Sequence, residues 1–335
     1  MNSDISRAES MSSVRYGAAS SRRLLIDAIK ALSVFGDAIT VVGAHAVHVW
    51  VQNAWGRIDM EATRDSDITI NPSFVAEDPK IIEMLKAIGV EPALSNRPGI
   101  YGLIDETGFP LQARTTFDIL VPEVYAGTGR RAARIPGQNN AATRAIGLEL
   151  VLWDRHMFNL ETFDEPNESV VAYIAGPASL LVAKIHKVHE RWEQRATSPE
   201  RLRPKDSGDI ALLMMVSDAN EVADIMRRNA LEHPEISQVV RSAAQWLSLL
   251  YGNLPSAPIT RQHAAISLAA RFNEVDVLKS IDTWLESFSF YESMGSWIHN
   301  AIITFTRFSP QLEIQAEEAA NQPPLHNPPL YYLSQ

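Results

Sequence analysis

The segments AITVVGAHAVHVW (38–50) and ATRDSDITI (62–70) decide the fold of this chain. In the first, an apolar and β-branched run ends at Gly43 and is followed by AHAVHVWVQ, which predicts a buried strand, a glycine turn and a helix. In the second, SDITINP (66–72) alternates polar and apolar residues and stops at a proline, which predicts another strand with one face on the core. The order strand, turn, helix, strand is typical of a domain that combines a sheet with helices.

Working outward from these segments, further elements follow on both sides. DPKIIEMLKAIG (78–89) predicts a helix with Asp78 as its N-cap. TTFDILVP predicts a strand at 115–121, and IGLELVLWD (146–154) predicts one more. From Gly176 onward long helical periods dominate up to about residue 308. We therefore predict an α+β fold, a mixed sheet with flanking helices followed by a mostly α-helical C-terminal domain.

The same patterns predict where the chain divides. A Ser- and Ala-rich start lacks any apolar period, and four prolines exclude a regular helix from the end. The predicted parts are a flexible arm, a catalytic domain, a helical domain that completes the site and a Pro-rich tail, at residues 1–20, 21–170, 171–320 and 321–335.

Composition excludes several classes of protein. The chain has 335 residues and no cysteine, so it forms no disulfide, no thiolate zinc site and no cysteine nucleophile. It contains neither an apolar run of membrane-spanning length nor a signal-peptide core, which predicts a cytoplasmic protein that makes no membrane contact. A net charge of −10 argues against a broad grip on nucleic acid, although residues 184–205 hold seven Lys or Arg against three Glu.

Three aspartates are the candidate metal ligands. Asp65 and Asp67 stand at i and i+2, so on a strand they point to the same side, about 7 Å apart. Asp118 lies within an apolar β-rich run, where burial is costly without a partner. Mg²⁺ prefers oxygen ligands and is held by carboxylates together with substrate phosphates. The alternatives without a functional role are a D-x-D pair in a surface loop, an Asp118 that faces solvent, and a Gly43 that only forms a turn.

The four segments VVGAHAV, ATRDSDITI, LLVAKIHKVHER (180–191) and RPKDSGDIALL (203–213) resemble, in this order, the nucleotidyltransferases of the polymerase-beta superfamily, and among them the AbiEii toxin-like group. The resemblance implies that Asp65, Asp67 and Asp118 hold Mg²⁺ or Mn²⁺. It also implies a set of nucleotide-binding residues, namely Gly43, Ala44, Lys184, Lys205 and Asp206.

Two features depart from the family pattern. Ala44 stands where Gly or Ser is usual, so a hydroxyl contact to phosphate is absent. The connection from Gly43 to Asp65 is longer than in compact members and is interpreted as an inserted loop that contains Trp50 and Trp55.

By resemblance, the reaction is transfer of a nucleoside monophosphate from an NTP to an acceptor hydroxyl. Toxin-like relatives imply an RNA acceptor such as a tRNA 3′ end, bound at residues 184–205, and a cognate antitoxin protein as partner. One alternative is a protein or small-molecule acceptor, for example an aminoglycoside. Another is a degenerate, non-catalytic member that binds a nucleotide or a partner. Taken locally, Lys184, Lys187 and Arg191 also fit a solvated basic stripe, and Asp206 a helix cap.

Overall fold

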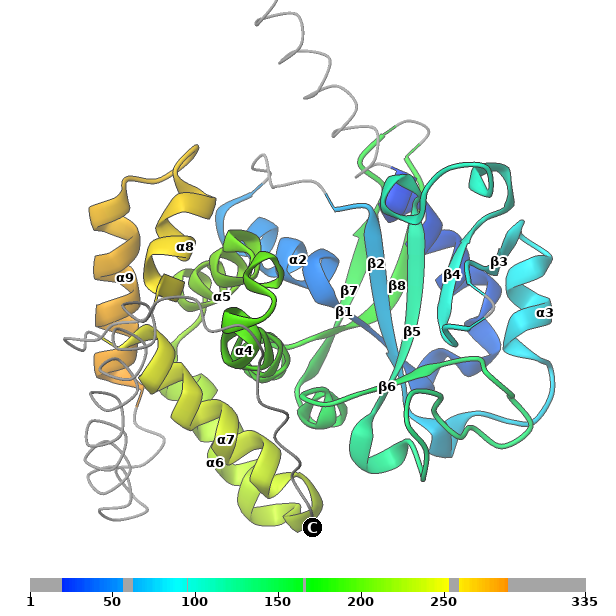
Figure 1. Ribbon diagram of the computed structural model, residues 1–335. Coiled ribbons are helices and arrows are strands. Elements are labelled where there is room, and N and C mark those ends of the chain that lie inside the picture. Colours follow the sequence, from blue (N-terminus) through cyan, green and yellow to red (C-terminus); the bar gives the residue numbers. More distant parts are fainter. Residues whose placement is uncertain (1–19, 57–62, 95, 165–166, 253–258, 289–335) are drawn as a thin grey trace, which may run out of the picture. The chain divides into compact units, whose positions relative to one another are not determined.

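The structure, a computed structural model, describes most of the chain, and all of the described residues belong to one compact unit (Figure 1). The described residues are 20–56, 63–94, 96–164, 167–252 and 259–288. The predicted arm, apart from Ser20, and the predicted Pro-rich tail lie outside them.

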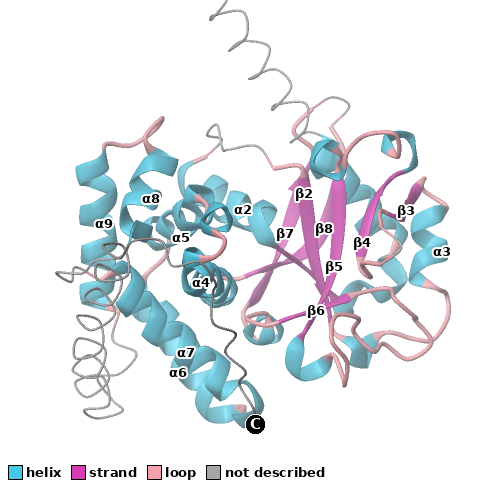
Figure 2. Ribbon diagram, in the orientation of Figure 1, coloured by secondary structure: helices cyan, strands magenta, loops and turns pink. Residues whose placement is uncertain are grey.

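Eight strands in the described part of the chain form one mixed sheet (Figures 1 and 2). Their spatial order is β3-β4-β5-β2-β1-β8-β7, with β6 beside β5. The pairs β1–β8, β2–β5 and β5–β6 are parallel and the others antiparallel. The strands are β1 (Ile39–Val42), β2 (Asp65–Ile70), β3 (Val90–Pro92), β4 (Ile100–Leu103), β5 (Thr116–Pro122), β6 (Thr143–Ala145), β7 (Arg155–Glu161) and β8 (Ser169–Ala175).

Helices flank this sheet and make up the second half of the described chain (Figure 2). Besides a helix over residues 20–31, they are α2 (Gly43–Trp55), α3 (Ile81–Lys86), α4 (Pro177–Glu193), α5 (Pro204–Val216), α6 (Ala219–Glu232), α7 (Pro234–Tyr251), α8 (Ile259–Leu268) and α9 (Glu274–Ser287). Helix α2 packs on β1, β2 and β8 and also contacts α4 and α5. It therefore links the sheet to the helical region.

The predicted α+β class is confirmed, with a mixed sheet, flanking helices and a helical second half. Strand β8 continues past residue 170, where the sequence placed a boundary, and lies next to β1 in the sheet. In the part of the chain that is described, no helix has the length and apolar character needed to cross a membrane.

One predicted helix starts later than expected, and one predicted strand is wrong. The helix expected from Asp78 begins only at Ile81, because Lys80 is its N-cap residue and the amide oxygen of Gln138 accepts the backbone N–H of Ile81. The strand expected at 146–154 is instead a short 3₁₀ helix, Glu149–Leu152, because the buried Glu149 carboxylate accepts the backbone N–H groups of Gly147 and Glu123. Tertiary partners override the local pattern in both cases.

The inserted loop expected between Gly43 and Asp65 is also wrong for its first half. Trp50 and Trp55 both belong to helix α2. The indole N–H of Trp50 donates to the carbonyl oxygen of Ala175 at 2.8 Å, which fastens α2 to β8. Residues 57–62 of the connection lie outside the described part.

Candidate active site

Two of the predicted carboxylates stand side by side on neighbouring strands. Strands β2 and β5 are parallel, and in their register Asp67 pairs with Asp118 while Asp65 pairs with Thr116. Register partners project to the same face of a sheet, and so do residues i and i+2 of one strand. The three aspartates therefore share one face, and the side-chain hydroxyl of Thr116 donates to Asp65 Oδ1 at 2.8 Å.

Gly43 brings the first turn of helix α2 against the Asp67 carboxylate. Its φ is +70°, a conformation that side chains disfavour, and a Cβ atom at this position would lie only 2.0 Å from Asp67 Oδ2. Glycine is thus required at position 43 for two reasons: the positive φ, and the lack of room for a Cβ atom beside Asp67. Because a helix N-terminus presents unpaired N–H groups, the turn after Gly43 is also suited to an anion such as a phosphate.

The environment of these aspartates disfavours their charged forms. Burial raises the pKa of Asp67, with a further contribution from Asp65, while the positive charge of Lys187 opposes the shift. Burial, followed by the charges of Asp67 and Asp65, raises the pKa of Asp118 well above its ordinary value. Asp118 Oδ1 is buried and has no hydrogen-bond partner. A cation at this position would relieve both the repulsion and the missing contact.

The residues fit a hard divalent cation that shares its ligands with substrate. Within the described residues, no group of three or more His, Asp or Glu side chains is arranged so that it could hold a metal ion by itself. Mg²⁺ is commonly held by one or two carboxylates, waters and substrate phosphates, so a pair such as Asp67 and Asp118 is sufficient from the protein. The available donors are oxygens, which excludes a site of the thiolate type.

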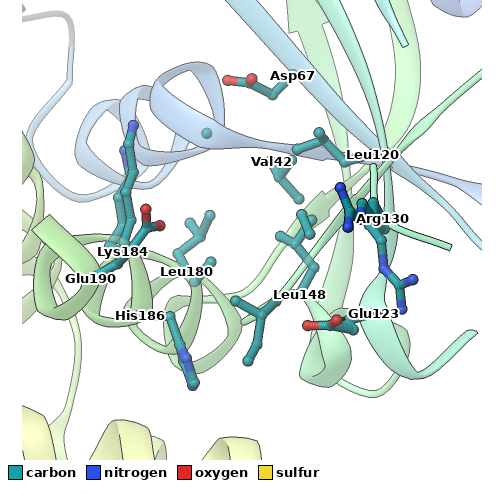
Figure 3. A pocket seen from close by; sticks show the side chains of 16 residues that line it. Val42, Asp67, Leu120, Glu123, Arg130, Leu148, Leu180, Lys184, His186 and Glu190 are labelled. Carbon is teal, nitrogen blue, oxygen red and sulfur yellow. Dashed lines mark ion pairs between the residues drawn. The ribbon is translucent and has the colours of Figure 1, made fainter. Parts of the chain in front are cut away.

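A pocket of about 450 Å³ opens beside Asp67. It lies between the sheet, helix α4 and the segment that joins β5 to β6. Figure 3 shows Asp67 at one end, with Glu123 and His186 at the other. Apolar side chains line its middle, whereas the cations that line it are Lys184, Lys187, Arg130 and Arg144. The volume is in the range of small-molecule sites.

Lys184 reaches this pocket from a buried ion pair. Its ammonium group contacts Asp209 Oδ2, which joins helix α4 to helix α5. Burial lowers the pKa of Lys184, but the charges of Asp209, Asp206 and Asp67 outweigh it, so the pKa is raised above its ordinary value. Lys184 is therefore a charged group that also holds two helices together.

The basic stripe predicted at residues 184–205 is largely neutralised, which corrects its interpretation as an open landing surface for a polyanion. Asp206, in the first turn of α5, is buried and accepts from Arg191, and it lies 3.1 Å from Lys187 Nζ. The side chain of Lys187 remains 48% exposed. Asp206 is thus the ionic partner of α4 cations, and neither it nor Lys205 lines the pocket.

The two remaining predicted residues lie close to the aspartates. Lys205 is half-buried, and its charge opposes the rise in the pKa of Asp67. Ala44 is buried in the first turn of α2, directly after Gly43. The structure therefore brings Gly43 and Asp67 to the pocket wall, with Asp118 and Lys205 near them.

Comparison with known proteins identified no relative. No family model, no curated protein and no solved structure matches the chain.

Sequence reasoning missed part of the pocket. Lys187 stood out only as a member of the stripe, although its spacing of three from Lys184 places both on one helix face. Arg130 and Arg144 belong to a segment, 126–145, that contains four arginines and no acidic residue. That local excess of charge in an acidic chain was the available signal.

Proposed function

We propose that this chain is a metal-dependent nucleotidyltransferase of the polymerase-beta superfamily, similar to the AbiEii toxin-like group. It moves a nucleoside monophosphate from an NTP to an acceptor hydroxyl. The observation that carries the proposal is the close packing of Asp67 on Gly43 at the start of α2, with Asp118 opposite Asp67 on β5. Carboxylates and an anion-binding helix terminus meet there, at the edge of a pocket that also holds cations.

Each part of the substrate has a suitable place. The triphosphate fits the N-terminus of α2 together with Lys184 and Lys187, since ammonium groups bind phosphate as point charges. The base and sugar fit the rest of the pocket, where Leu148 and Leu180 offer apolar contact. Asp67 and Asp118 would hold the divalent cation, with Asp65 adding negative charge on the same face of β2. The cation, when bound, supplies charge neutralisation for the reacting phosphate.

In the proposed reaction, the acceptor oxygen forms a bond to the α-phosphorus of the NTP. The bond between the α-phosphorus and the oxygen that bridges it to the β-phosphorus breaks. Pyrophosphate leaves with the electron pair. The acceptor's proton passes to the carboxylate of Asp118, which stands opposite Asp67 on β5. The positively charged lysines of α4 favour the charge that develops on the leaving group.

We propose RNA as the acceptor, with a cognate antitoxin as the protein partner. The support for RNA is the arginine segment 126–145, in which Arg130, Arg131 and Arg134 are exposed and Arg130 lines the pocket. Within the described residues, no ion pair involves these three arginines. Unpaired arginines bind phosphodiesters well, and in a chain of net charge −10 they form a local site for a polyanion.

The decisive experiment incubates the full chain with each α-labelled NTP, Mg²⁺ or Mn²⁺ and total RNA, and follows the label into RNA, protein or small molecules. Asp67→Asn should reduce transfer by about a hundredfold or more, because it removes a metal ligand without changing volume. The control is Asp105→Asn, an exposed aspartate on the short 3₁₀ helix Ile104–Glu106.

Three results would redirect or reject the proposal. Label in a small molecule or a protein replaces RNA as acceptor and keeps the reaction. Tight NTP binding without transfer by the wild-type protein identifies a non-catalytic binder. Equal activity of Asp67→Asn and wild type rejects the site.

A further inference from the structure

A buried polar cluster is hydrogen-bonded to the segment that leads into β2, the strand of Asp65 and Asp67. Its members are Ser21 and Arg22, from the helix at residues 20–31, and His45, from the first turn of α2; each is at most 1% exposed. Arg22 Nε donates to His45 Nδ1 at 3.1 Å, and His45 Nε2 lies 3.0 Å from Ser21 Oγ. None of the three lines the pocket.

The hydrogen bonds assign the protons in this cluster. Ser21 Oγ donates its single hydrogen to the carbonyl oxygen of Thr63 at 2.7 Å, so it must accept from His45 Nε2. His45 Nδ1 is then the acceptor for Arg22. This arrangement requires the neutral imidazole with its hydrogen on Nε2, and burial correspondingly lowers the pKa of His45 well below its ordinary value.

The cluster reaches both halves of the site. On one side, the hydroxyl of Thr63 donates to the carbonyl oxygen of Asp65 at 3.1 Å and accepts from the Asp65 N–H at 3.3 Å, which fixes the start of β2. On the other side, His45 belongs to the helical turn that begins at Gly43, against which Asp67 packs. One imidazole thus connects the carboxylate strand with the phosphate-binding helix.

Arg22 makes this connection at a cost in stability. Its side chain is buried, Nη2 has no hydrogen-bond partner, and within the described residues no carboxylate forms an ion pair with it. Burial lowers its pKa to about 9. The Phe163 ring, 4.4 Å from the guanidinium carbon, offers only a cation–π contact. Proteins keep such unfavourable groups mainly where function requires them.

We propose that His45 is a positioning residue of the active site, held by Arg22 and Ser21, which sets the distance between Asp65 on β2 and Gly43 on α2. The inference rests on the proposed function for the identity of the bound cation. It adds residues that touch neither nucleotide nor cation and act through hydrogen bonds alone.

The test compares Mn²⁺ affinity, by calorimetric titration of the full chain, in two His45 variants. His45→Leu keeps an apolar volume but removes both hydrogen bonds, and it should weaken Mn²⁺ binding about 10- to 100-fold, as loss of outer-shell partners typically does. His45→Gln should stay within about threefold of wild type, because its amide oxygen can accept from Arg22 and its N–H can donate to Ser21.

His48→Leu is the matched control. His48 is buried on the same helix, one turn further on, and its Nδ1 has no partner, so Mn²⁺ affinity should not change. Arg22→Met supplies a readout that a purely structural role would not produce. It should weaken Mn²⁺ binding while leaving the Tm equal to or above that of wild type, because it removes an unpaired buried charge.

Hydrogen exchange separates this inference from the proposed function. In His45→Leu, amides of residues 65–70 should exchange faster than in wild type, whereas amides of β4 should not change. If wild type binds no Mn²⁺ but this selective exchange is seen, the proposed function fails and the positioning role stands. A folded His45→Leu protein with wild-type exchange in β2, or with the Mn²⁺ affinity of a wild type that binds Mn²⁺, would overturn the inference.

Discussion

At the scale of single residues, Gly43 is the most constrained position of the proposed site. Asp67 lies where a Cβ atom would be, so a side chain must move either the helix or the carboxylate. Replacement also forces a non-glycine residue to a φ of +70°, which costs about 1–2 kcal/mol by itself. The steric clash and the cost of the positive φ can be separated with a control glycine that has a similar φ but no atom close to the position of a Cβ.

Gly43→Ala should therefore lose Mn²⁺ and nucleotide binding and lower the free energy of unfolding by more than about 2 kcal/mol. Gly89→Ala is the control, because Gly89 has a φ of +78° and a Cβ atom there would meet no heavy atom within 4 Å. It should show the backbone cost alone and keep ligand binding. Urea unfolding and nucleotide titration of both variants measure the difference. Equal losses in the two variants would contradict the close-packing argument.

Asp118 predicts a dependence of stability on pH. Its pKa in the folded protein is raised well above 3.8, so the folded state retains a proton that the unfolded state releases. In the metal-free protein, the contribution of Asp118 to the free energy of unfolding should be fully present below pH 3.8. This contribution should be lost as the pH rises through the folded-state pKa. Mn²⁺ must displace the proton, so its affinity should increase with pH.

Asp118→Asn should remove both effects. At pH 8 without metal, its Tm should exceed that of wild type by about 2–4 °C, which corresponds to roughly 1 kcal/mol for a domain of this size. Added Mn²⁺ should raise the Tm of wild type but not of the variant. Thermal unfolding between pH 5 and 8.5, with and without Mn²⁺, provides the measurement. A wild-type Tm that Mn²⁺ leaves unchanged at every pH would count against a metal site here.

At the scale of elements, helices α4 and α5 are joined by ion pairs that also border the pocket. Lys184 and Asp209 are both nearly buried, so removing one partner leaves an uncompensated charge. Asp206, in contrast, has two cations, Lys187 and Arg191. Stability and ligand binding should accordingly respond differently to changes at Lys184 and Lys187.

Lys184→Met should lower the free energy of unfolding by about 3–5 kcal/mol, and the double variant Lys184→Met with Asp209→Leu should recover most of this loss. Neither should bind NTP as wild type does. Lys187→Met should unfold nearly as wild type, because Arg191 still pairs with Asp206, while NTP affinity falls about tenfold, or ~1.4 kcal/mol. Denaturant titrations and fluorescent-nucleotide binding distinguish the cases. Wild-type NTP affinity in Lys187→Met would remove α4 from the triphosphate site.

At the scale of the whole molecule, charge is distributed unevenly between two basic segments of an acidic chain. The cations of residues 184–205 are mostly engaged, since Arg201 pairs with Glu190 and Arg195 lies over the Trp192 ring. The arginines of residues 126–145 are freer, with Arg144 paired to Glu123 at 3.3 Å. We therefore expect RNA to bind at residues 126–145 and not at residues 184–205.

Arg131→Gln with Arg134→Gln should weaken binding of a labelled single-stranded RNA and reduce the slope of log affinity against log salt by about 1 to 2, as expected for two lost phosphate contacts. Arg195→Gln with Arg201→Gln removes the same charge from the other segment and should change little. Fluorescence anisotropy at several salt concentrations compares them. A larger loss of RNA affinity in Arg195→Gln with Arg201→Gln would instead place the RNA-binding site at residues 184–205.

Local periodicity was sufficient to predict the β1–α2–β2 unit and the common side of Asp65 and Asp67. Strand, turn and helix there follow from contiguous residues, and a spacing of two on a strand sets the direction of side chains regardless of what surrounds them. The α+β class followed from the same patterns, because they change from short strands to long helices at Gly176.

Tertiary structure alone decided which distant residues meet. The register that sets Asp118 opposite Asp67 depends on how β5 pairs with β2, and a spacing of 51 residues between them carries no local periodicity. Asp206 likewise changed from a proposed nucleotide or cap residue to an ionic partner of α4, because two helices pack there. Packing also selected the buried proton arrangement of His45. Such contacts arise from the path of the folded chain, whereas a sequence pattern reports only on neighbours along it.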